Sequence, residues 1–147
     1  MLKDSTPDCQ ETVYIGNVNL QVNRLNLFLE AKLLGFKRIL IIEDDIIFNN
    51  DIHHIEECIT NFPLDYDIVN MDPYVVLHDN VMKEVNKLYY EPKTATYNCS
   101  FISFTSKAID NVIEAMSNMK SLVPSDNIKA YVKPDVKYCI CSKNICI

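Results

Sequence analysis

The sequence predicts an α/β protein with a mostly parallel, doubly wound sheet flanked by helices. Two observations lead to this fold class. The apolar, β-branched run from Ile39 to Ile42 is typical of a strand covered on both faces, and stretches of helical periodicity alternate with strands along the chain. The 147 residues are 48% hydrophobic, which is enough for one domain with its own core. We expect a flexible lead-in at residues 1–12 and a single domain at 13–147.

The first predicted helix runs from about Asn19 to Leu34, because apolar residues recur there at three- and four-residue spacing and Gly35 supplies a stop. The β-branched strand follows it and is expected at the centre of the sheet. Asn50 or Asp51 is then placed to cap a second helix. The inward side of that helix would carry Ile52, Ile55 and Ile59.

Two short strand pieces are predicted next, at residues 66–71 and 74–77, with the turn signal Asp72-Pro73 between them. Residues 78–92 fit no single pattern. Residues 95–104 are rich in aromatic and β-branched types and predict another strand.

The last part of the chain predicts two helices and a strand. Thr105 or Ser106 can cap the first of these helices, and Ser125 can cap a short second one. A final strand is expected near residues 136–141. The inward residues of the helix after Thr105 would be Ala108, Ile109, Val112, Ile113 and Met116.

Charge and hydropathy exclude two classes of protein. The formal net charge is −6, whereas binding to a nucleic-acid backbone needs a clustered basic surface. No stretch approaches the roughly 18 apolar residues of a membrane span, and the start lacks the apolar core of a signal peptide. We therefore expect a cytoplasmic protein without nucleic-acid partners.

Six cysteines are present, and without a secretory signal they are expected to be reduced thiols. Cys139 and Cys141 would lie on one face of a strand. With Cys146 they form the only cluster, whose spacing lacks the second ligand pair of a zinc finger. Ordinary burial is the preferred interpretation.

The strongest functional signal is the acidic triplet Glu43-Asp44-Asp45, directly after the predicted central strand. Three adjacent carboxylates repel one another in a partly desolvated site, so a compensating cation is expected. Along an extended chain Glu43 and Asp45 point to one side and Asp44 to the other, so a pair can chelate a metal while the third does another task. Ligands of open α/β sheets also collect at the carboxyl ends of strands.

The alternative is a solvated turn that merely ends the apolar run. The apolar residues Ile46-Ile47-Phe48 resume at once, so the triplet is held between buried segments instead of lying in a polar loop. This context favours a functional site.

Around the triplet the chain has an amphipathic helix ending at Leu34, a short basic turn at Lys37-Arg38, the strand with its acidic end, and the aromatic Phe48. In this order it resembles the family-25 glycosyltransferases over about thirty residues. Residues 97–108 are similar to that family's second block, a strand followed by a helix start with small residues. Residues 123–127 are similar to its third block, a proline followed by an acidic residue that opens a helix.

The resemblance implies a nucleotide-diphospho-sugar transferase fold of the GT-A type. Little precedes Thr12 that could supply the early strand of that fold, and residues 13–17 are the only substitute, so this strand would be reduced and the fold shortened at its amino-terminal side. The resemblance also implies a divalent metal, usually Mn²⁺, and a donor diphosphate held by Asp45 and Asp44, with Glu43 assisting. Arg24 would contact phosphate or be solvated.

Further candidates follow from position and residue type. Asp126 is the candidate catalytic base for the acceptor hydroxyl, or a residue that positions the acceptor, although a helix-capping role explains it equally well. Asp72 should lie at the same sheet edge as the triplet and contact substrate. Tyr97 could stack on a sugar or pack in the core. His53 and His54, with two nearby glutamates, are expected on a solvated helix face.

The sequence thus predicts a metal-dependent glycosyltransferase that moves a sugar from a nucleotide-sugar donor to a hydroxyl acceptor on a glycan, lipid or protein. Two alternatives remain open at this point. One is a non-catalytic carbohydrate-binding or assembly domain with the same fold. The other is a different metal-dependent phosphate enzyme that uses the same acidic strand end.

Overall fold

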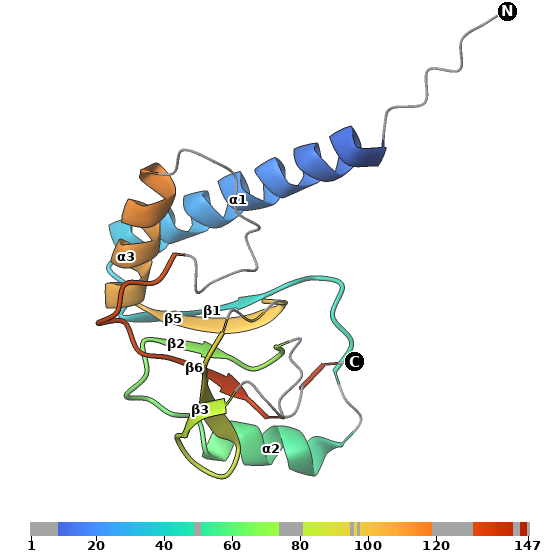
Figure 1. Ribbon diagram of the computed structural model, residues 1–147, viewed down its shortest axis with the longest axis vertical. Helices are drawn as coiled ribbons and strands as arrows, with labels where there is room; N and C mark the ends of the chain where they lie inside the picture. Colours follow the sequence, from blue (N-terminus) through green and yellow to red (C-terminus); the bar gives the residue numbers. More distant parts are fainter. Residues whose placement is uncertain are drawn as a thin grey trace, which may run out of the picture.

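The computed structural model describes residues 9–48, 51–73, 81–94, 96, 98–118, 131–142 and 145–146. The elements within these residues, in chain order, are α1 (Cys9–Leu33), β1 (Arg38–Ile42), α2 (Ile52–Thr60), β2 (Ile68–Asn70), β3 (Val81–Glu84), β4 (Tyr89–Pro92), β5 (Phe101–Thr105), α3 (Ser106–Ser117) and β6 (Tyr138–Cys141). Figure 1 shows a single sheet with α1 and α3 on one face and α2 on the other. None of these helices combines the length and the apolar character needed to cross a membrane.

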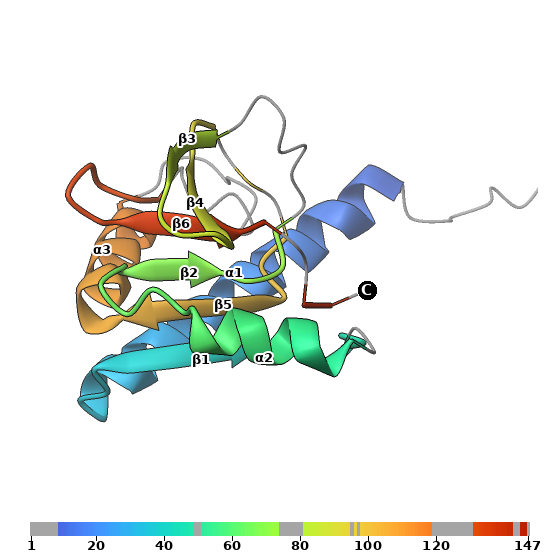
Figure 2. The same cartoon turned by 90° about the horizontal axis from the view of Figure 1, so that it is seen from below.

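In the described part of the chain the sheet has six strands in the order β1-β5-β2-β6-β4-β3, and the only parallel pair among them is β2 with β6. The expectation of a mostly parallel, doubly wound sheet of the GT-A type is therefore wrong. The β5 strand inserts antiparallel between β1 and β2, and the antiparallel pair β3–β4 extends the sheet beyond β6 (Figure 2). Alternating helical and strand patterns do not reveal such reversals, because a strand reached through a loop can run in either direction.

The prediction of a central β1 is also wrong. In the described part of the chain β1 pairs only with β5 and forms one edge of the sheet. Leu40 and Ile42 each keep 48% of their surface exposed. The β-branched run does form a strand, but only one of its faces is well covered.

Two apolar clusters lie on opposite faces of the sheet. The cluster under α1 and α3 contains Phe28, Ile102, Phe104, Ile109 and Ile140, among others. The rings of Phe28 and Phe104 meet edge to face with centroids 5.0 Å apart. The other cluster, beside α2, includes Cys58, Tyr89, Cys139 and Cys141. Cys139 and Cys141 thus share a face of β6, as predicted.

The helix α1 ends as the sequence predicts, but it begins ten residues earlier than Asn19. Gly35 lies just past its end with a φ of +73°, a left-handed conformation that glycine adopts without steric cost. Residues 13–17 fall inside this helix. They therefore do not form the reduced strand that the resemblance implied.

The caps of α2 and α3 are confirmed. Asp51 accepts a hydrogen bond from the backbone N–H of His54, and Thr105 accepts one from that of Ala108. The inward face of α3 is also as predicted, whereas that of α2 is only partly so, because Ile55 alone of its three predicted residues packs against the cluster beside α2. Ile52 and Ile59 are exposed, and the buried positions of α2 are His54 and Cys58.

Several expected elements can be compared only in part. The strand expected at 95–104 is the shorter β5, the strand expected at 136–141 is β6, and the ambiguous segment 78–92 contains the pair β3–β4. The strand piece at 74–77 and the helix capped by Ser125 lie outside the described residues.

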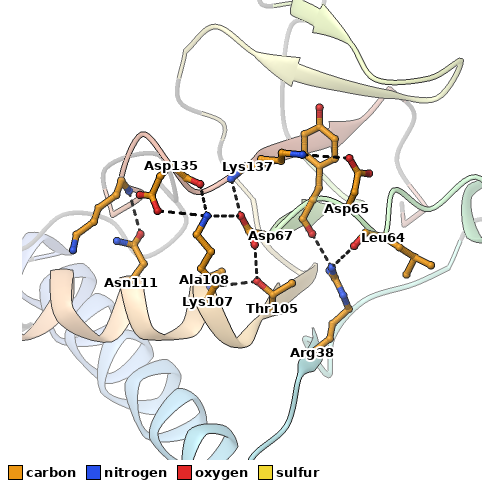
Figure 3. A network of polar contacts seen from close by, with 12 residues as sticks. Arg38, Leu64, Asp65, Asp67, Thr105, Lys107, Ala108, Asn111, Asp135 and Lys137 are labelled. Atoms are coloured by element: carbon orange, nitrogen blue, oxygen red, sulfur yellow. Dashed lines mark hydrogen bonds and ion pairs between the residues drawn. The ribbon is translucent and has the colours of Figure 1, made fainter.

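A polar network fixes the end of the sheet that lies away from the triplet (Figure 3). Asp67 accepts hydrogen bonds from the backbone N–H of Lys137 at 3.0 Å and from Thr105 Oγ1 at 3.0 Å, and it pairs with Lys107 Nζ at 3.3 Å. Burial alone would raise the pKa of Asp67, but these three donors outweigh it and hold the pKa below its ordinary value. One carboxylate thus joins β2, the β5–α3 junction and the start of β6.

Candidate functional site

The triplet lies at the carboxyl end of β1, and its first residue has a structural partner. The backbone N–H of Glu43 continues the pairing with β5 by donating to the carbonyl oxygen of Ser100 at 2.9 Å. The Glu43 side chain accepts a hydrogen bond from Arg24 Nη2 at 2.9 Å. The Arg24 side chain is only 8% exposed, so this arginine is not solvated. Its charge is met by Glu43, which ties α1 to the end of β1.

Asp44 and Asp45 differ from Glu43 because both are exposed in a turn directly after the strand. Within the described residues neither carboxylate has a hydrogen-bond donor or a basic partner. The extended alternation expected along the triplet therefore stops at Glu43. One carboxylate of the three is structural, and the next two are free to bind a cation.

A second polar group follows β2. Asp72 is 4% exposed and accepts a hydrogen bond from Asn98 Nδ2 at 2.7 Å. Asn70, the last residue of β2, donates through Nδ2 to the Asn98 carbonyl at 2.7 Å and accepts from the Asp72 N–H at 3.0 Å. The Ser100 hydroxyl donates to Asn98 Oδ1. Asn98 has a φ of 65°, which asparagine tolerates better than most residues.

The two groups lie at the same end of the sheet. Both β1 and β2 run antiparallel to β5, the strand between them, so their carboxyl ends point the same way. Ser100 connects the groups because its carbonyl accepts from Glu43 and its hydroxyl donates to Asn98. The position expected for Asp72 relative to the triplet is therefore present, with Asp72 held inside a hydrogen-bonded loop.

The described side chains could bind a metal only if a bound ligand supplied part of its coordination. No three histidine, cysteine, aspartate or glutamate side chains gather around one point among the described residues. Asp44 and Asp45 could supply at most two carboxylates, and the other ligands would have to be phosphate oxygens and water. This is how Mg²⁺-like ions are commonly bound at phosphate sites.

The remaining predicted residues are placed as follows. Tyr97 and Asp126 lie outside the described residues, so their roles stay predictions. His53 is exposed as expected, but His54 is buried, with its Nε2 3.6 Å from Cys58 Sγ. That sulfur is also 3.6 Å from Cys141 Sγ.

Asn98 and Ser100 were not predicted as site residues. The available signal was an asparagine beside small residues just before a strand, which is common in ordinary turns. They contact the candidate site because β5 runs antiparallel between β1 and β2, which brings residues 98–100 between the ends of those two strands.

Comparisons with protein-family models and with curated proteins found no match to this chain. The resemblance to the family-25 glycosyltransferases therefore remains a prediction from the motifs.

Proposed function

We propose that this protein binds a nucleotide-sugar donor through a divalent metal, by preference Mn²⁺, at Asp44 and Asp45, and transfers the sugar to a hydroxyl acceptor. The observation that carries the proposal is that the three carboxylates of the triplet differ in their partners. Glu43 is paired with Arg24, whereas the next two carboxylates are exposed at a strand end and have no partner among the described residues. Two free adjacent carboxylates are a site for a cation that brings further ligands with it.

The surrounding residues support such a site. The Arg24–Glu43 pair and the Glu43 N–H bond to Ser100 hold the start of the turn, so the two aspartates follow a fixed strand end. Asp72, Asn98 and Ser100 are linked by hydrogen bonds at the same end of the sheet. A bound divalent ion would neutralise the charge that develops on a departing nucleotide diphosphate.

The acceptor side of the proposal follows from the sequence resemblance. Asp126 remains the proposed base for the acceptor hydroxyl, and Tyr97 a proposed sugar contact, on the strength of the sequence resemblance alone. The acceptor class, a hydroxyl on a glycan, lipid or protein, follows from the same source.

A second candidate function is a non-catalytic carbohydrate-binding or assembly domain. The observation that favours it is the exposed, apolar edge strand β1, which is suited to association with another chain. A third candidate, another metal-dependent phosphate enzyme, would use the same two aspartates.

A turnover screen separates these functions. The full chain is incubated with Mn²⁺ and a panel of uridine- and guanosine-diphospho-sugars, and release of nucleoside diphosphate is measured. We expect release that needs the metal and is abolished in Asp45→Asn. The matched control is Glu84→Gln, which removes one exposed carboxylate from β3 and should leave release unchanged.

Two results would point elsewhere. Release of phosphate from simple esters, without attack on any nucleotide sugar, would favour the phosphate enzyme. Metal-independent binding of glycans without turnover would favour the binding domain.

A further inference from the structure

The two edges of the sheet differ in how they are protected against pairing with another strand. The β3 edge has a register irregularity between Val81 and Lys83, and it carries the charged residues Lys83 and Glu84. Bulges and charges are common devices that block edge-to-edge association. The β1 edge has neither device, because its five residues pair regularly with β5 and all after Arg38 are apolar.

The register with β5 identifies which backbone groups of β1 face outward. The Glu43 N–H donates to Ser100, and the Lys37 carbonyl accepts from the Ser106 N–H. In an antiparallel pair every second residue forms backbone hydrogen bonds with the neighbouring strand. The backbone groups of Lys37, Ile39, Ile41 and Glu43 therefore point toward β5. The N–H and C=O groups of Arg38, Leu40 and Ile42 therefore point to the open edge, where no strand of the described chain meets them.

Apolar side chains flank this open edge on both faces. Leu40 and Ile42 lie on the face away from Ile39 and Ile41, which pack against the cluster under α1. On the α1 face a groove of about 340 Å³ runs between the helix and the strand. Its exposed lining includes Leu27, Leu34 and Phe36, with exposed fractions of 47%, 60% and 52%. An apolar strip of this kind beside free backbone groups is typical of an interface.

The charges at the two ends of β1 are complementary to each other. Lys37, at the start, is exposed and has no side-chain partner in the described residues, and the acidic triplet lies at the other end. A second β1 placed antiparallel therefore brings the basic start of one strand to the acidic end of the other. In the register centred on Leu40, Lys37 lies opposite the partner's Glu43 and Arg38 lies diagonally beside the partner's Asp44.

We propose that this edge binds a second copy of the same chain, with β1 antiparallel to the partner's β1, so that one sheet continues across the dimer. The pairing is self-complementary, because Arg38, Leu40 and Ile42 face outward in both copies and a two-fold axis through Leu40 matches all five strand residues. The same axis places both α1 helices on one face, where the two apolar grooves cover each other.

The test is sedimentation velocity of the full chain over a range of concentrations, without nucleotide. We expect a concentration-dependent dimer that weakens as salt rises, because charge pairs at its ends are screened. Leu40→Lys places two ammonium groups at the two-fold axis and should weaken the dimer at least about ten-fold. The matched control is Met82→Lys on β3, 60% exposed in the chain, which makes the same change at the other edge and should leave the dimer intact.

A second variant tests the register. Lys37→Glu sets a carboxylate opposite the partner's Glu43 and should weaken the dimer and remove most of its salt dependence, and circular dichroism confirms that each variant is folded. The proposal is overturned if the wild-type chain stays monomeric, or if Leu40→Lys dimerises as well as Met82→Lys. A wild-type monomer that adds an unrelated strand at this edge would likewise overturn it. Failure of the donor site would not affect these results, because no donor is present.

Discussion

Arg24 Nη2 lies 2.9 Å from Glu43 Oε1, and this contact joins the middle of α1 to the carboxyl end of β1. The arginine is almost fully buried, whereas about a third of the Glu43 side chain remains exposed. The pair therefore anchors the first residue of the triplet and leaves Asp44 and Asp45 beyond it. A structural role for Glu43 and a binding role for the two aspartates can be tested separately.

A double-mutant cycle measures the Arg24–Glu43 contact. Arg24→Met leaves Glu43 without its partner and should lower the free energy of unfolding by about 1–2 kcal/mol. Glu43→Gln should also destabilise the chain, because it removes the negative charge that lies 2.9 Å from the buried guanidinium. In urea denaturation the double variant should lose less than the sum of the two singles, with a coupling of about 1 kcal/mol. Strictly additive losses would show that the contact does not hold α1 to β1.

The Asp67 network makes stability depend on acid pH. The pKa of Asp67 is lower in the folded chain than in the unfolded one, so its contribution is complete above the unfolded value of about 3.9 and is lost as pH falls through the folded value. Asp67→Asn should lower the free energy of unfolding at neutral pH by about 1–3 kcal/mol. It should also flatten the decline in stability below about pH 4.

The matched control for Asp67 is Asp65→Asn. Asp65 is 72% exposed and contacts only Lys137 at 3.4 Å among the described residues. Urea denaturation between acid and neutral pH should give this variant a profile close to that of the wild type. If the free energy of unfolding of Asp67→Asn fell at acid pH as steeply as that of the wild type, Asp67 would not be the source of the acid sensitivity.

Asn98 has a left-handed backbone conformation and a side chain that donates to Asp72. Two substitutions separate the contributions of these two features to stability. Asn98→Gly keeps the left-handed backbone free of strain but removes the amide that donates to Asp72. Asn98→Ala removes the same amide and adds a left-handed penalty of about 1 kcal/mol. Chemical denaturation should therefore rank the wild type above Asn98→Gly, and Asn98→Gly above Asn98→Ala. Equal stability of the two variants would indicate that the loop relaxes to another backbone conformation.

Five buried cysteines should react slowly with thiol reagents in the folded chain. Cys58, Cys99, Cys139, Cys141 and Cys146 are all buried thiols. Burial, followed by the charge of Asp72, raises the pKa of Cys146 to about 11, so few thiolates exist at pH 8. Labelling monitored by mass spectrometry should be slow for these five residues before urea is added and rapid afterwards. Fast native labelling of Cys146 would contradict its burial.

Local features of the sequence predicted local features of the structure well. The stop at Gly35, the caps at Asp51 and Thr105, and the shared face of Cys139 and Cys141 depend on nearby residues and on simple periodicities, and all are present.

The sheet topology could not be predicted in the same way. The reversal at β5 and the position of β1 at an edge depend on which strands pair at long range, and an apolar run such as Ile39–Ile42 is compatible with either place. The prediction for the α2 face was partly wrong for a related reason. Which side of a short helix is buried depends on the neighbours that pack there, here Tyr89, whose hydroxyl donates to the Cys58 carbonyl.

The candidate site was predicted in position but not in detail. The triplet does follow a strand, and Asp72 does lie at the same end of the sheet. The ion pair between Arg24 and Glu43 could not be predicted from the sequence, because the two residues are nineteen positions apart on different elements.

A metal and diphosphate site at Asp44 and Asp45 can be tested by calorimetric titration of uridine and guanosine diphosphate into the full chain with Mn²⁺. We expect that one nucleotide binds only when the metal is present, that Asp45→Ala abolishes binding, and that Glu84→Gln leaves it unchanged. Binding that persists in Asp45→Ala, or no metal-dependent binding of either nucleotide, would contradict it.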